Sequence, residues 1–130
     1  MPFNIYDYVD ARGRNRFKEW CQTLTRVERI KLNERLDKLE LHGPVMRPHV
    51  LAGTGVGGLE KLRVHGNTQL RPLLTEGPLN VGKEFTLLLG AREVGSKWVP
   101  ANAKTEAAAN KQAVIDDGGT TRRKEHERVE

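Results

Sequence analysis

The sequence contains very few of the residues that build disulfide frameworks and serine-based catalytic sites. Among its 130 residues, Cys21 is the only cysteine and Ser96 the only serine. A single cysteine excludes an internal disulfide and a thiolate-rich metal site, and a single serine gives little support to a serine-based triad. Cys21 lies among Phe17, Trp20 and Leu24 at helical spacing. We therefore expect it to be a buried core thiol.

Long apolar runs and a signal peptide are also missing. No run approaches the roughly 20 apolar residues that span a bilayer, and the first residues lack the basic and apolar regions of a secretory signal. The four histidines, His42, His49, His65 and His126, show no spacing typical of metal ligands. We expect a cytoplasmic protein that does not associate with a membrane and binds neither a metal nor a cofactor.

Positive charge is modest but unevenly distributed. The chain carries 22 Lys and Arg against 17 Asp and Glu, a net charge of +5. Residues 1–42 contribute +2, residues 43–100 contribute +3, and residues 101–130 are neutral overall. An anionic partner is one explanation, with nucleic acid as the first candidate. The excess lies in the middle of the chain, so any such site should lie there.

Hydrophobic periodicity predicts one small α+β domain. Period-two alternation indicates a strand over residues 3–9, and helical spacing then indicates two helices, with Thr25 and Glu28 forming a capping box at the start of the second. Strands follow, and Pro72 requires a bulge or an edge position in one of them. The predicted ranges are helices 14–24 and 26–42, strands 59–65, 68–75 and 83–90, and a helix over 101–115. The polar segment 117–130 is predicted to be a disordered tail.

A glycine-rich segment over residues 53–58 contains the pattern G-x-G-x-x-G. In dinucleotide-binding proteins this pattern follows a strand and opens a helix, so that the pyrophosphate meets free backbone amides. Here the next residues alternate like a strand. We therefore interpret 53–58 as a flexible loop and exclude nucleotide cofactor binding.

One strand face concentrates positive charge. Lys61, Arg63 and His65 alternate with apolar residues, and Arg71 joins them if its strand pairs through the turn at residues 66–67. Such cations could cradle a phosphate, and during RNA cleavage by a 2′-OH they could stabilise charge on phosphorus. A proton acceptor and donor are also needed, for which His65, His49 or a lysine could serve. The same alternation is typical of the solvated side of an antiparallel sheet.

Several segments together resemble the RelE/ParE toxin superfamily, in particular its phage-derived, HigB-like branch. They are the stretch 48–53, Gly58-Leu59-Glu60-Lys61-Leu62-Arg63, Leu70-Arg71 and the apolar strand 85–89. The resemblance covers about residues 3–116 and implies a domain over 1–116. The implied fold is an N-terminal strand and a helical hairpin packed on a small antiparallel sheet, with a C-terminal helix.

The resemblance implies the toxin of a type II toxin–antitoxin pair, a metal-independent mRNA endoribonuclease that acts on the translating ribosome and arrests growth. Its partners would be mRNA, the ribosome and a helix-turn-helix antitoxin. Matching positions assign catalytic roles to Arg63, Arg71 and Lys97, and the expected RNA-binding residues are Lys61, His65, Arg92 and His49. Only one lysine stands where the family has a pair. A ParE-like gyrase inhibitor or an inactive phage-related binding module is therefore the alternative.

Overall fold

The computed structural model describes residues 2–130 and begins with strand β1 (Asn4–Tyr8). Two helices follow, α1 (Arg16–Thr23) and α2 (Arg26–His42). The Thr25 hydroxyl accepts from the Glu28 N–H while the Glu28 carboxylate accepts from the Thr25 N–H. This reciprocal cap fixes the start of α2 at the predicted residue. A short 3-10 turn, η1 (Gly43–Met46), follows α2.

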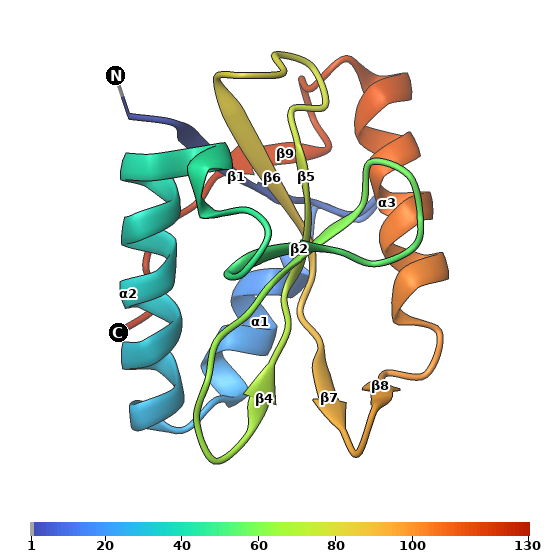
Figure 1. The fold of residues 1–130 in the computed structure, drawn as a ribbon. Helices are drawn as coiled ribbons and strands as arrows, with labels where there is room; N and C mark the ends of the chain where they lie inside the picture. Colours follow the sequence, from blue (N-terminus) through green and yellow to red (C-terminus); the bar gives the residue numbers. More distant parts are fainter. Residues whose placement is uncertain (1) are drawn as a thin grey trace.

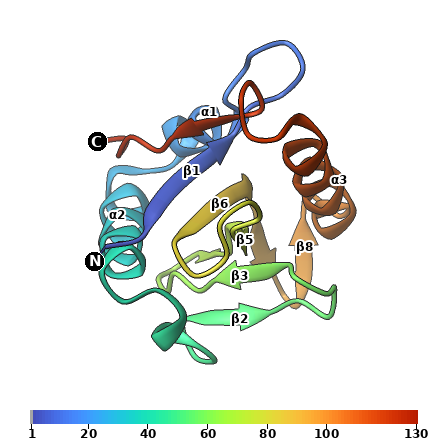
Figure 2. The ribbon, with the colours of Figure 1, turned by 90° about the horizontal axis from the view of Figure 1, so that it is seen from above.

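The main sheet has six strands in the order β2-β3-β5-β6-β1-β9. Its remaining members are β2 (Leu51–Gly53), β3 (Glu60–Leu62), β5 (Leu73–Glu76), β6 (Glu84–Leu89) and β9 (Arg123–Glu125). β6 lies inside the sheet and residues 84–88 are buried, as its near-continuous apolar sequence predicts. Seen from above, the strands form a curved layer between the helices (Figure 2).

Helices cover both faces of this sheet (Figures 1 and 2). On one face α1 and α2 bury Phe17, Cys21 and Leu36 against strand residues such as Phe85. On the other, α3 (Ala103–Asp117) buries small side chains, with Ala103 and Ala107 fully enclosed. Alanines allow this helix to approach the sheet closely, so its sequence matches its position.

A second, three-stranded sheet lies at one end of the domain, at the bottom of Figure 1. It consists of β4 (Gln69–Leu70), β7 (Arg92–Val94) and β8 (Lys97–Val99), in the order β4-β7-β8. Gly95 and Ser96 form the β7–β8 turn with φ of 54° and 70°. Positive φ at both positions is typical of a type I′ hairpin turn.

The fold class is α+β, as predicted, but several details of the prediction were wrong. β1 pairs in parallel with β6, so the sheet is mixed rather than antiparallel. The predicted strand over 68–75 is two strands, because Arg71 and Pro72 separate β4 from β5. Residues 43–58, for which neither a helix nor a strand was predicted, include η1 and β2.

The prediction of a disordered tail over 117–130 was also wrong. β9 pairs antiparallel with β1 and forms an edge of the main sheet. His126 Nδ1 lies 2.7 Å from Asp7 Oδ1, and both side chains are at most 2% exposed. The chain end then crosses to α2, where Arg128 pairs with Asp37 and Glu40. Polar and charged contacts therefore hold most of this segment, and Val129 packs against the core.

Candidate active site

Lys61, Arg71 and Glu93 converge where the two sheets meet. Lys61 extends from β3, Arg71 follows β4 and Glu93 lies on β7. Glu93 Oε1 accepts a hydrogen bond from Lys61 Nζ at 3.0 Å and lies 3.3 Å from Arg71 Nε. One carboxylate oxygen thus joins two cations from separate segments of the chain. The three side chains are 17%, 9% and 22% exposed.

Arg63 adds a third cation to this cluster. Its Nη1 donates to the backbone oxygen of His49 at 3.2 Å, while its own backbone N–H donates to Val50. Burial lowers the pKa of Arg71, Glu93 opposes that shift, and the charge of Arg63 adds to it. The Leu62 N–H donates to the Pro72 oxygen and the Val64 N–H to the Leu70 oxygen, so Arg63 lies opposite Arg71. The cluster of Lys61, Arg63, Arg71 and Glu93 has a formal charge of +2.

Arg71 has little freedom to meet a ligand. Its guanidinium donates to the backbone oxygens of Val64 and Leu70 and to the Gln69 side chain. These contacts fix the guanidinium beside Glu93, so Arg71 holds Glu93 in place. Of the three cations, Lys61 is 17% exposed and Arg63 is half-buried, so both are better placed than Arg71 to contact an anion.

Lys97 and Arg92 lie outside this cluster. Glu93 pairs with Trp98 across the β7–β8 hairpin, so these two side chains share one face. Alternation then places Arg92 and Lys97 on the other face. Arg92 Nη1 lies 3.5 Å from Glu28 Oε2, and Lys97 is exposed.

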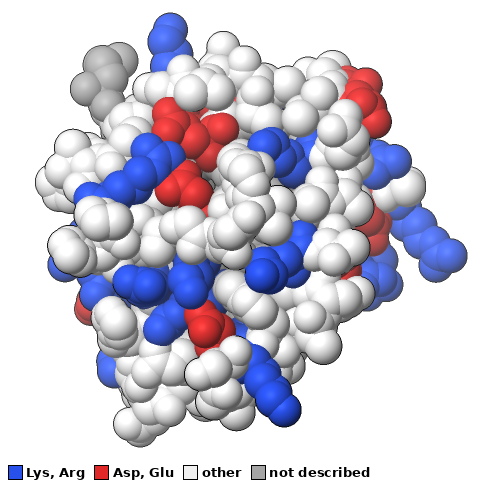
Figure 3. All heavy atoms as spheres, turned by 45° about the vertical axis from the view of Figure 1, so that its right-hand side comes forward, with Lys and Arg blue, Asp and Glu red and all other residues white. Residues whose placement is uncertain are grey.

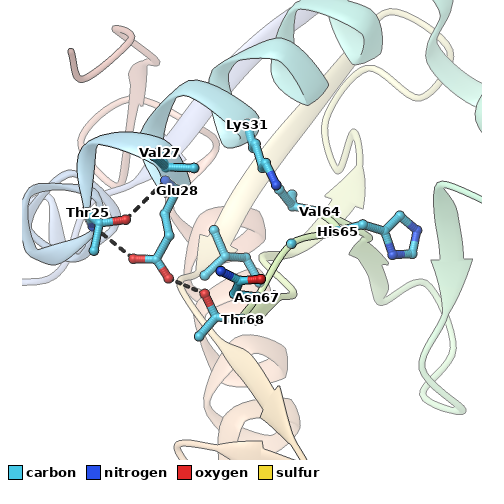
Figure 4. A pocket seen from close by; sticks show the side chains of 10 residues that line it. Thr25, Val27, Glu28, Lys31, Val64, His65, Asn67 and Thr68 are labelled. Atoms are coloured by element: carbon cyan, nitrogen blue, oxygen red, sulfur yellow. Dashed lines mark hydrogen bonds between the residues drawn. The ribbon is translucent and has the colours of Figure 1, made fainter.

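His65 borders a surface cavity of about 450 Å³ between α2 and the β3–β4 loop (Figure 4). At one end of the cavity, Thr68 donates from its hydroxyl to Glu28, the residue that also caps α2. His65 lies at the other end, near Lys31. The cavity therefore lies on the α2 side of the molecule. His49 contacts the cluster through its backbone oxygen, which accepts from Arg63.

Glu93 and Trp98 are site residues that sequence reasoning missed. Lys61 Nζ lies 5.5 Å from the centre of a Trp98 ring, within the range of a cation–π contact. The dipeptide Gly95-Ser96, between residues of a suitable pattern, is a known hairpin signal and could have identified β7 and β8. It would have placed Glu93 opposite Trp98, although not beside Arg71.

The described chain offers no support for a metal centre or a nucleotide fold. Among residues 2–130, no group of three or more His, Cys, Asp or Glu side chains could hold a metal ion. The glycine-rich segment connects antiparallel β2 to β3 and does not open a helix. None of α1, α2 and α3 has the length and apolar character of a membrane-spanning helix.

Comparison with known proteins identifies no relative of this chain. No protein-family model, curated protein or solved structure matches the chain. The site must therefore be interpreted from its own chemistry. Figure 3 shows one face of the molecule, on which Lys and Arg side chains form several groups, some directly beside acidic residues.

Proposed function

We propose that this protein is a metal-independent endoribonuclease, the toxin of a type II toxin–antitoxin pair, with the Lys61–Arg63–Arg71–Glu93 cluster as its active site. The observation that carries the proposal is the contact of Glu93 with two cations, Lys61 on β3 and Arg71 between β4 and β5. A phosphodiester needs cations to offset charge on phosphorus, and its 2′-OH needs a proton acceptor. This cluster contains both kinds of group.

The proposed reaction begins when the 2′-oxygen attacks the adjacent phosphorus. Glu93 accepts the 2′-OH proton, and the ammonium of Lys61 donates a proton to the departing 5′-oxygen. The P–O5′ bond breaks, leaving a 2′,3′-cyclic phosphate and a free 5′-OH. Arg63 offsets the charge that develops on the phosphoryl oxygens. Arg71 is a positioning residue, because its contacts orient Glu93.

The order of elements supports the same proposal. An N-terminal strand, two helices, a set of strands and a further helix follow one another as the resemblance to RelE/ParE toxins implies. The proposed partners are translating ribosomes, mRNA and a helix-turn-helix antitoxin. An adjacent reading frame that encodes such an antitoxin would support the class independently of the chemistry.

Induced expression in bacteria tests this function. The intact protein should arrest growth, and primer extension on cellular mRNA should show new 5′ ends. Arg63→Ala and Glu93→Gln should each lower cleavage by about 10²- to 10³-fold. Arg12→Ala, in the exposed β1–α1 loop, is the control for loss of a surface arginine.

Circular dichroism of each variant separates loss of activity from loss of folding. Unchanged cleavage by folded Arg63→Ala and Glu93→Gln would refute the assigned site. Growth arrest without new mRNA ends would instead favour the gyrase-inhibitor or binding-module alternative. If the intact protein caused neither growth arrest nor cleavage, the toxin proposal would be rejected altogether.

A further inference from the structure

We propose that single-stranded RNA follows a defined track on this protein, from the proposed active site across Trp98 to the glycine-rich loop 53–58 and to Lys104 and Lys111. This inference rests on the proposed function and extends it, since it assigns residues that bind RNA away from the cleaved bond. The track consists of four exposed or half-buried cations, one indole ring and one uncovered segment of backbone.

Trp98 forms the first step of the track beyond the cluster. It shares a face of the β7–β8 hairpin with Glu93, and Lys61 lies over its ring. The indole is half-buried and packs against the core cluster that includes Ala103. Unpaired bases stack on aromatic rings of this kind, whereas the bases of a duplex already stack on one another. A rigid indole beside cations therefore favours single-stranded RNA.

The glycine-rich loop starts beside Lys61, the cation that lies over the Trp98 ring. Ala52 of β2 pairs with Lys61 of β3, so the loop that joins these strands starts next to the cluster. A Cβ atom at Gly53 or Gly57 would meet nothing within 4 Å, and neither residue has a positive φ. Neither packing nor backbone conformation requires glycine at these two positions. Their effect is to leave the backbone uncovered for close approach of a ligand.

Two lysines of α3 border the same loop. Lys104 Nζ lies 3.4 Å from the backbone oxygen of Thr54, and a side chain at Gly58 would collide with Lys111 Nζ. The lysines are seven residues apart, which places them on one helix face and about 10 Å apart along the axis. The first, Lys104, directly follows Ala103, which packs in the same cluster as Trp98.

The acidic residues near the track are either paired with a cation or directed away from the track. Glu60, at the end of the loop, is paired with Arg47 at 2.5 Å. Glu106 is two residues from Lys104 and therefore faces about 200° around α3. Lys104 and Lys111 thus keep a net positive field over the loop. A chain of phosphates is the ligand that matches cations in such a row.

Binding should be measured separately from cleavage. Fluorescence anisotropy with a labelled single-stranded RNA, 2′-O-methylated so that it cannot be cut, reports the affinity of the full-length protein. Lys104→Gln with Lys111→Gln should weaken binding at least about tenfold at low salt and reduce the salt slope by about 1.4. Lys18→Gln with Lys83→Gln, on α1 and the β5–β6 loop, removes the same charge elsewhere.

The ring provides a second, independent measurement. Trp98→Ala should weaken binding about fivefold or more, while Trp98→Phe should retain most of the affinity because it keeps an aromatic face. Equal affinities and salt slopes for the α3 pair and its control would overturn the track. Duplex RNA that binds as tightly as the single strand would also overturn it.

These results are distinguishable from failure of the proposed function. If the α3 pair weakens binding but the intact protein never cuts unmodified RNA, then the track stands and the nuclease proposal fails. If cellular mRNA is cut and the α3 pair changes nothing, then the nuclease proposal stands and the track fails.

Discussion

Replacing Glu84 with glutamine tests whether the last strand is part of the folded domain. Glu84 and Arg123 are 3% and 9% exposed, and Glu84 Oε2 lies 2.5 Å from Arg123 Nη1. The guanidinium also stacks 3.9 Å from the centre of the Tyr6 ring. Glutamine keeps the side-chain length and an oxygen that can accept from the N–H groups of Leu79 and Asn80. The substitution therefore removes mainly the charge.

Removing one partner of a buried ion pair leaves the other charge uncompensated, which costs about 3–5 kcal/mol. Glu84→Gln should lower the free energy of unfolding by that amount. At about 4 °C per kcal/mol for a domain of this size, the midpoint should fall by about 12–20 °C. Urea unfolding followed by circular dichroism measures the free energy, and a thermal scan measures the midpoint.

Two comparisons make this result specific. Glu84→Gln combined with Arg123→Met removes both charges, and it should recover at least half of the loss. Lys124 and Glu127 form an exposed pair in the same segment, with side chains 62% and 71% exposed. Glu127→Gln should cost less than about 1 kcal/mol. A similarly small cost for Glu84→Gln would refute the reasoning, because the last strand would then contribute little to the fold.

Three further predictions concern other groups held by the fold. Burial, helped by Asp7, raises the pKa of the Cys21 thiol to about 12, so a thiol-reactive disulfide reagent should label it only after unfolding, and rapid labelling of native protein would contradict this. Burial raises the pKa of Glu28, but hydrogen bonds led by that from Thr68 outweigh it and lower the pKa below 4.5. The resulting stability is complete above that pH and lost as pH falls through the folded-state pKa, so Glu28→Gln should flatten the acid limb of urea-unfolding free energies measured against pH. His126→Ala leaves Asp7 without one of its buried partners and should cost about 2–3 kcal/mol in urea unfolding, whereas full stability would contradict the described contact.

Features of the fold that depend on neighbouring residues were predictable from the sequence. Thr25 and Glu28 cap α2 through contacts three residues apart, and the bounds predicted for that helix are those observed. Pro72 lacks a backbone N–H, and the predicted interruption lies there. In each case the deciding interaction lies within a few positions of the residue that signals it.

Features that depend on distant partners were not predictable. β9 contains only charged residues, and its segment is held by Glu84 and Asp7, which lie 39 and 119 positions from Arg123 and His126. Composition makes such a segment resemble a disordered tail, because no local pattern shows that its charged groups pair with buried residues elsewhere in the chain. Glu93 was missed for the same reason, since its contacts with Lys61 and Arg71 join different strands.

The electrostatics of the cluster differ from those of the solvated face of an ordinary sheet. On a solvated face the charged groups lie in water, whereas the side chains of Lys61 and Arg71 are only 17% and 9% exposed. Burial and the neighbouring charge of Arg63 both lower the pKa of Arg71, and the single carboxylate of Glu93 only partly compensates. An apolar residue in place of Arg71 would avoid this cost. Charged groups buried at such a cost are concentrated at functional sites. An anion held by Lys61 and Arg63 would reduce the repulsion between Arg63 and Arg71.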